Sequence, residues 1–276
     1  MHLFNTVVPG LLVPFSRNID DEMLSSHKLS SSLRRFRYVL AGLIVLSLAG
    51  CTSIKPNQGD AQFTGVELGT HVDLQLCMYK DSQISDRQAT DIISAIQNEF
   101  SQYGVNVQVP VIKPWQRPSF KHQGILNDIA KRPLEPPCDR LMALVGRDVR
   151  DFLWGVFLPE VLGAVETRTH TKGYVVAEMG SFNQLMSFRS PAEGAIHEFY
   201  HMFGYAHGDD RQTIVSKIAH LKRMALSNWQ SGQDFFPGIS SEGTLYLSRR
   251  EVDQRFGLVA TSPGTVGLTA AYRNNQ

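Results

Sequence analysis

Four residues within a short stretch have the types and the spacing of a metal site. From His197 to His207 the sequence follows the pattern H-E-x-x-H-x-x-G-x-x-H. His197 and His201 are four residues apart, so on a helix they lie on one face and can bind the same metal ion. Gly204 can adopt a positive φ and turn the chain sharply, which allows His207 to approach as a third imidazole ligand. The pattern therefore predicts a Zn²⁺ site with three histidine ligands and an open fourth position.

Glu198 is the candidate catalytic residue of this site. It lies beside the helix face that carries the two histidines, where it can contact a metal-bound water rather than the metal. Three neutral imidazoles leave the charge of Zn²⁺ uncompensated, and water bound to zinc can reach a pKa of about 7. We expect Glu198 to take a proton from this water as general base and to pass it to a leaving amine. The alternative, histidines packed in an apolar core, would need unusual hydrogen-bond partners for the imidazoles.

The eleven-residue pattern resembles that of the metzincin zinc peptidases, and looser similarities extend over residues 66–260. The resemblance implies an α/β (α+β) fold, in which a mixed, twisted sheet carries the active-site helix and a smaller, mostly helical or irregular subdomain follows. Metzincins place a methionine in a tight turn beneath the zinc. Met224 is the only methionine after His207, so the resemblance implies Met224 as this Met-turn, and residues 247–253 match the closing helix of the matrixin branch loosely. Tyr200 departs from the pattern, since many metzincins have a small residue there.

The resemblance also implies a function and a substrate. Residues 161–164 and 173–176 lie where metzincins carry the strand pair that leads into the active-site helix. In those enzymes one edge strand binds an extended peptide through its main chain, by β-augmentation. We therefore expect a zinc metalloendopeptidase that acts on a polypeptide bound in extended form. A non-catalytic, zinc-containing binding or assembly lipoprotein of the cell envelope is the alternative, and the presence of Glu198 favours the enzyme.

The N-terminal residues predict export and a lipid anchor. Residues 38–50 carry no charge, and three arginines precede them: Arg34, Arg35 and Arg37. The run is shorter than the roughly 18–20 residues that a membrane-spanning helix needs, and it is typical of a secretory signal peptide. It ends in Leu48-Ala49-Gly50-Cys51, which resembles the lipobox of bacterial lipoproteins, in which the cysteine thiol is acylated. The resemblance implies cleavage before Cys51 and lipidation of its thiol.

The predicted signal peptide and the zinc motif set the expected boundaries within the chain. We expect a signal peptide over residues 1–50, a polar tether over 51–65, an N-terminal α/β subdomain over 66–207 that ends in the zinc motif, and a C-terminal subdomain over 208–276. The acidic run before Met23 is atypical of a signal peptide and favours Met23 as the true start. Because Thr52 rather than an aspartate follows Cys51, we expect the outer membrane, facing the periplasm, if the host is diderm.

Composition limits the other functions. The chain has 276 residues, of which 42% are apolar and 19% are charged, which excludes a disordered tail and a polytopic membrane protein. With 27 Lys and Arg against 26 Asp and Glu, the formal charge of +1 gives no electrostatic support for nucleic-acid binding. The expected partners are therefore a polypeptide substrate and the membrane that holds the lipid.

The spacing of apolar residues predicts elements in the order β-α-β-β-β-β-α, followed by helices and loops. Expected strands cover residues 71–79, 105–112, 141–145, 161–168 and 173–178. Expected helices cover residues 85–103, 125–131, 191–203, 215–226 and 248–256. Pro110 indicates an edge strand or a strand end. His170 and the two residues after it form a polar turn between the last two strands, and we expect His170 to be a surface or strand residue.

Cys77 and Cys138 remain once Cys51 is assigned to the lipid. An exported protein can hold a disulfide, and two cysteines allow only one pairing. Cys77 lies late in one expected strand and Cys138 just before another. If these strands are parallel neighbours, the thiols lie at opposite ends, too far apart to bond. The sequence leaves this bridge undecided.

Overall fold

The computed structural model describes residues 68–147, 161–178 and 190–259. All described residues belong to one compact unit of the chain. The expected signal peptide, the lipidation site Cys51 and the tether lie outside the described residues. Within the described ranges, no helix is both long enough and apolar enough to cross a membrane.

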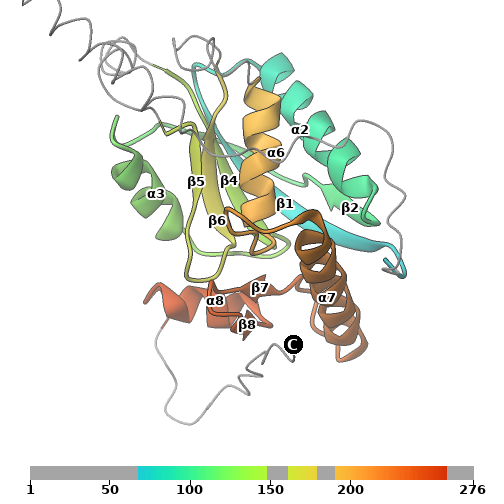
Figure 1. The fold of residues 1–276 in the computed structure, drawn as a ribbon. Coiled ribbons are helices and arrows are strands. Elements are labelled where there is room, and N and C mark those ends of the chain that lie inside the picture. Colours follow the sequence, from blue (N-terminus) through green and yellow to red (C-terminus); the bar gives the residue numbers. More distant parts are fainter. Residues whose placement is uncertain (1–67, 148–160, 179–189, 260–276) are drawn as a thin grey trace, which may run out of the picture. The chain divides into compact units, whose positions relative to one another are not determined.

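A mixed sheet with helices on both faces dominates the described part of the chain, which confirms the expected α/β (α+β) class (Figure 1). The strands of this sheet are ordered β2-β1-β4-β6-β5, and β3 also pairs with β1. They run parallel to their neighbours except β5, which pairs antiparallel with β6. The elements are, in chain order, β1 (Val72–Asp81), α2 (Asp86–Ser101), β2 (Val105–Gln108), β3 (Ile112–Trp115), α3 (His122–Ala130), β4 (Arg140–Val145), β5 (Gly163–Val165), β6 (Lys172–Val176), α6 (Pro191–His201), α7 (Arg211–Gln230), β7 (Gly238–Ile239), β8 (Leu245–Tyr246) and α8 (Arg249–Arg255).

Helices pack on both faces of the sheet because its central strands are apolar on both sides. All six residues of β4 are buried. Met142 and Leu144 belong to the core shared with α2 and α6. Leu141, Ala143 and Val145 belong to the core shared with α3, which is the alternation expected of a strand. Helix α6 therefore lies on the sheet, in contact with β5 and β6.

The expected strand over residues 105–112 is divided into two short strands. β2 pairs with the first half of β1, and β3 pairs with the second half. Pro110 lies in the gap between them, where its missing N–H breaks no strand pairing. The prediction of a strand end at this proline is confirmed.

Three helices begin at serines that form capping boxes: Ser85 for α2, Ser190 for α6 and Ser248 for α8. In each box the serine side chain accepts a bond from the third helical N–H, and the side chain at that position bonds back to the serine N–H. The three helices expected at these places are confirmed. Helix α7 begins earlier and ends later than the expected range of 215–226, and Asp210 is its N-cap.

Cys77 and Cys138 form a disulfide, which decides the pairing that the sequence leaves open, and the inference that parallel strands would hold the thiols too far apart is wrong. Their Cα atoms are 5.4 Å apart. Strand β1 extends to Asp81, beyond the expected end at residue 79, and its register sets Leu76 opposite Arg140. Cys77 is therefore near the middle of β1 and level with the start of β4, rather than at the far end of the pair.

Candidate metal centre

Helix α6 presents two of the predicted ligands near its C-terminal end. The helix begins at the Ser190 cap, and Pro191 occupies its first turn, where a missing N–H has no consequence. Phe199 is fully buried in the core and fixes the rotation of the helix on the sheet. His197 and His201, one turn apart, are half-buried. Their spacing on a packed helix thus directs both imidazoles towards one place.

The chain turns at Gly204 and brings back His207. Gly204 has a φ of +77°, a conformation that L side chains rarely adopt. Its carbonyl accepts a bond from Lys217 Nζ at 2.8 Å, and Lys217 also pairs with Asp209 at 2.6 Å. Asp209 in turn accepts a bond from the N–H of Ala206 at 2.9 Å. These bonds hold the loop that carries the exposed His207.

The three histidines converge on one point. His197 Nε2 is 3.1 Å from His201 Nε2 and 3.3 Å from His207 Nε2. Zinc–nitrogen bonds of about 2.05 Å at a tetrahedral angle place two ligand nitrogens about 3.3 Å apart. One ring nitrogen from each histidine lies within 4.8 Å of the other two. The two separations measured from His197 thus match the spacing that a tetrahedral metal ion requires.

The positions of the protons also fit a metal ion. His201 Nδ1 lies 2.7 Å from the carbonyl oxygen of Tyr205, which can only accept, so Nδ1 carries the proton and Nε2 a lone pair. Burial lowers the pKa of His201 below 6.5, which keeps the ring neutral at pH 7. A single proton on His197 Nε2 would then have to serve both of its nitrogen contacts. One cation shared by the three lone pairs removes this conflict, so the cluster could hold a metal.

Glu198 lies next to the ligands and is shielded from water. The residue is 7% exposed. Burial raises the pKa of its carboxyl from 4.5 to about 8. Its side chain reaches strand β5, where it packs against the backbone of Gly163. The residue predicted to be the general base is therefore held between α6 and β5, the last strand of the described sheet.

Met224 does not lie in a turn, so the expected Met-turn at this position is wrong. The residue is in the second half of α7 and is half-buried. Leu221 and Ala225, buried at helical spacing on either side of it, keep the chain helical through this position. The expectation of a helix over 215–226 and that of a turn at Met224 exclude each other, and the helix is the one that forms.

Residues 235–240, which we call the floor segment, lie beneath the Gly204 turn. All six are buried, although the sequence reads as a loop. A Cβ placed on Gly204 would be 2.9 Å from the side chain of Ile239, so Ile239 supports the turn between the second and third ligands. The N–H of Ile239 donates to the carbonyl of Thr169 at 3.0 Å, and its own carbonyl lies 2.5 Å from His170 Nδ1.

Arg140 joins the floor segment to the end of α6. Its side chain is fully buried. The guanidinium donates to the carbonyls of Phe236 at 3.0 Å and Pro237 at 2.6 Å, and it also reaches the carbonyl of Met202 at 3.4 Å. Met202 is the C-cap of α6. Sequence reasoning missed Arg140; the signal that could have found it is a lone arginine directly before the apolar run over residues 141–145.

The polar turn between β5 and β6 is buried, and the expectation of a surface position for His170 is wrong. Glu166 explains why this polar turn can be buried. Its carboxylate accepts bonds from the N–H groups of Thr169 at 2.9 Å and Thr171 at 2.8 Å, which satisfies backbone groups that water would otherwise have to reach. His170 itself has a φ of +52° and is 6% exposed. The turn can therefore pack against the floor segment, where Thr169 and His170 contact the main chain of Ile239.

Tyr200, the departure from the metzincin pattern, packs into the core against α2. Its ring centroid is 4.8 Å from that of Phe100, and the residue is 1% exposed. Its hydroxyl donates to Glu99 and lies 2.7 Å from the hydroxyl of Tyr103. The bulky residue thus connects α6 to α2 through buried polar groups.

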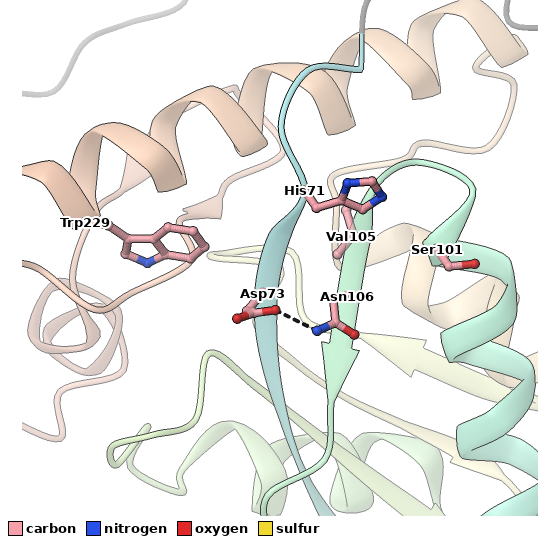
Figure 2. Close-up of a pocket in the computed structure, with 6 residues that line it drawn as sticks. All are labelled: His71, Asp73, Ser101, Val105, Asn106 and Trp229. Carbon is pink, nitrogen blue, oxygen red and sulfur yellow. Dashed lines mark hydrogen bonds between the residues drawn. The ribbon is translucent and has the colours of Figure 1, made fainter.

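A hollow of about 340 Å³ lies where β1 and β2 begin (Figure 2). It is lined by His71, Asp73, Ser101, Val105, Asn106 and Trp229. None of these belongs to the zinc motif. Asn106 donates to Asp73 at 2.7 Å, and the two residues face each other in the register of neighbouring strands. This pair is typical of an exposed sheet surface and does not by itself indicate a ligand.

No protein family matches the chain, and no curated protein matches it. Among solved structures, the chain is similar to an archaemetzincin from Methanopyrus kandleri, with 19% sequence identity and a TM-score of 0.37. The match covers 56% of this chain and 88% of the archaemetzincin. What the geometry of the chain itself establishes is a cluster of three histidines that could bind a metal ion, next to a buried glutamate.

Proposed function

We propose that this protein is a zinc-dependent metalloendopeptidase of the metzincin type. The observation that carries the proposal is the convergence of three imidazole nitrogens, with separations of 3.1 and 3.3 Å from His197, beside the buried carboxyl of Glu198. A ligand set, a neighbouring proton acceptor and a free sheet edge are the three parts that hydrolysis of an extended peptide needs. The described residues supply a candidate for each part.

Zn²⁺ is the proposed cofactor, with His197, His201 and His207 as ligands. A set of three histidines is found in catalytic zinc sites, where the fourth position stays open. Two of the ligands are half-buried and His207 is exposed, which leaves one side of the cluster accessible to solvent and substrate. Bound Zn²⁺ would lower the pKa of a water ligand to about 7 and polarise the carbonyl of the scissile bond.

Glu198 acts on protons in this proposal. One carboxylate oxygen takes the proton from the attacking water, and the same group then delivers it to the nitrogen of the leaving amine. Burial of the carboxyl excludes competing water. Burial alone raises its pKa to about 8, and a Zn²⁺ ion bound beside it would favour the ionised form that accepts the proton. The three histidines bind and orient, and Glu198 moves the proton.

Strand β5 offers main-chain groups to a peptide. Leu162 accepts a bond from Val176, and Glu166 donates to Lys172 across the same strand pair. In an antiparallel ladder every second residue bonds to the neighbour, so the N–H and C=O groups of Gly163 point to the other side, away from β6. Since β5 is the last strand in the described sheet, these groups are available to an extended substrate.

The variant Glu198→Gln tests the function. The side chain keeps its size but cannot accept the proton, so we expect about one zinc per chain and a loss of cleavage of about 10²–10⁴-fold. Elemental analysis gives the metal content, and a broad peptide library gives a substrate for the rate measurement. Glu193→Gln, on the same helix, is the matched control, because glutamine also completes a capping box.

Two outcomes would contradict the enzyme. If Glu198→Gln cleaves as fast as the parent, the proposed proton acceptor is wrong. If the parent binds zinc but cleaves nothing in the library, the non-catalytic binding or assembly lipoprotein takes the place of the peptidase.

The lipid anchor is a separate proposal. We propose that acylated Cys51 holds the protein at the membrane, on the outer membrane facing the periplasm in a diderm host. The support is the uncharged run that ends in the lipobox-like Leu48-Ala49-Gly50-Cys51. Cys51→Ala is expected to move the protein from the detergent phase to the aqueous phase in a partition assay. Unchanged partition would exclude this anchor and would leave the peptidase proposal as it stands.

A further inference from the structure

We infer that Gly163 is a positioning residue for Glu198: the absence of a side chain at position 163 allows the carboxylate to lie beside the metal ligands. The inference rests on the proposed function, in which Glu198 moves the proton. Gly163 is the first residue of β5, and Glu198 lies on α6, so the contact joins the edge strand to the metal-binding helix.

The space at Gly163 is occupied by Glu198. A Cβ built on Gly163 would lie 2.4 Å from Cγ, 2.7 Å from Cδ and 2.8 Å from Oε1 of Glu198. Carbon atoms that are not bonded to each other prefer separations of about 3.5–4.0 Å, so even an alanine at this position would overlap the side chain along most of its length.

Backbone conformation does not explain this glycine. Gly204 and six other described glycines have a positive φ, which only glycine adopts easily, but Gly163 is not among them. A strand residue in an ordinary conformation would normally carry a side chain, since glycine weakens a strand. The close approach of another element is the remaining reason for a glycine here, and that element is the Glu198 side chain.

The side chain of Glu198 is the part that would give way to a larger residue at 163. Helix α6 cannot retreat, because Phe199 and Tyr200 are at most 1% exposed and pack against Phe100 of α2. Rotation about the side-chain bonds of Glu198 is the easiest movement left, and it displaces the carboxylate while His197 and His201 stay in place. A substitution at Gly163 is therefore expected to affect proton transfer and to leave the ligands alone.

Gly163 also provides the outward-facing main-chain groups of β5. One residue thus touches the catalytic carboxylate on one side and would bond to the substrate main chain on the other. A substitution that adds a side chain keeps these main-chain groups. The expected effect consequently falls on kcat rather than on KM.

Gly163→Ala tests the inference in the full chain. We expect an unchanged content of one zinc per chain, a fall in kcat of at least about tenfold and a change in KM of less than about threefold. Gly194→Ala is the matched control on α6, since its Cβ would be 3.6 Å from Val175, an ordinary contact. The control is expected to keep the parent kcat. A parent-like kcat in Gly163→Ala, or a loss that falls only on KM, would overturn the inference.

A second measurement is independent of activity. In thermal unfolding, Gly163→Ala is expected to lower the Tm by about 3 °C or more, because of the overlap with Glu198. In the Glu198→Ala background the overlap is absent, so the same substitution should lower the Tm by less than half as much. Equal losses in both backgrounds would show that position 163 does not act through Glu198.

The kinetic and the thermal-unfolding measurements allow a failure of this inference to be distinguished from a failure of the proposed function. If the protein cleaves no peptide, the unfolding cycle still reports whether residues 163 and 198 are coupled. If Gly163→Ala alone fails to fold, the double variant with Glu198→Ala is expected to fold again, and its failure would contradict the inference as well.

Discussion

Replacement of Arg140 by methionine is expected to weaken metal binding at a site whose ligands Arg140 does not touch. The fully buried guanidinium donates to the carbonyls of Phe236 and Pro237 in the floor segment and to that of Met202 at the end of α6. Burial lowers the pKa of Arg140 from 12.5 to about 10, so the group is still charged at neutral pH. Methionine fills much of the space but offers neither the charge nor a donor.

The loss of stability follows from the groups left behind. A buried polar group without its partner costs about 1–3 kcal/mol, and four carbonyls lose their donor here, because Arg140 also donates to the carbonyl of Asp139. Water that enters the site can bond to some of these carbonyls and so reduces the loss of free energy. We therefore expect the free energy of unfolding to fall by about 3–5 kcal/mol, the range found when one side of a buried charged network is removed.

The effect on the metal follows from the contact between the floor segment and the Gly204 turn. Ile239 supports this turn, and the turn carries His207 back to the other two ligands. Without the hydrogen bonds from Arg140, the floor segment can shift, and His207 can then move. Loss of a residue that supports metal ligands typically lowers metal affinity by about 10–100-fold, and we expect a value in this range.

Arg132→Met is the control for this comparison. Arg132 pairs with Asp128 at 2.9 Å at a partly exposed position, and such a pair contributes at most about 1 kcal/mol. Urea unfolding measures the stability of each variant, and competition with a chelator measures its zinc affinity. The reasoning is refuted if Arg140→Met binds zinc as tightly as Arg132→Met.

Three further predictions concern stability and the rejected Met-turn. The double variant Cys77→Ser/Cys138→Ser is expected to lose about 4 kcal/mol in urea unfolding, because the disulfide joins residues 61 apart; an unchanged midpoint under non-reducing conditions would argue against the bridge. Lys172→Met should lower the free energy of unfolding by about 3–5 kcal/mol, since Lys172 is fully buried and pairs with Asp253 at 3.3 Å; adding Asp253→Leu should restore part of the loss. Met224→Leu should change stability by less than about 1.5 kcal/mol and leave zinc affinity unchanged, and a tenfold weaker affinity would return Met224 to the site.

The convergence of the three histidines could be predicted because it depends on local geometry. A four-residue spacing places His197 and His201 on one helix face in any protein, and a glycine three residues on supplies the turn that returns His207. The capping box at Ser190 sets the start of the same helix by an equally local rule. Each of these features depends on neighbours in sequence, so no knowledge of the rest of the fold is needed.

The Met-turn and the disulfide could not be predicted in this way because both depend on tertiary packing. The resemblance implies Met224 because it is the only methionine after His207, whereas the side chain that contacts the Gly204 turn is that of Ile239, which the bond to Thr169 holds there. The disulfide depends on the register between β1 and β4. β4 pairs with the second half of β1, with Leu76 opposite Arg140, and this register brings Cys77 beside Cys138.

The candidate metal centre is supported by buried polar residues. A pattern of hydropathy wrongly predicts that these residues lie on the surface. Such a pattern puts arginine, glutamate and histidine on the surface, because a charge in a core is costly unless several partners meet it. Arg140 is buried for the same reason in reverse, because the folded chain brings distant carbonyls to it, whereas Glu166 bonds to the nearby N–H groups of Thr169 and Thr171. The partners of Arg140 at Met202 and Phe236 are 62 and 96 residues away, at the end of the metal-binding helix and in the floor segment. The side chain of Arg140 therefore belongs both to the start of β4 and to the contacts that support the histidine cluster. A substitution at Arg140 should change the stability of the fold and the metal affinity of the histidines together.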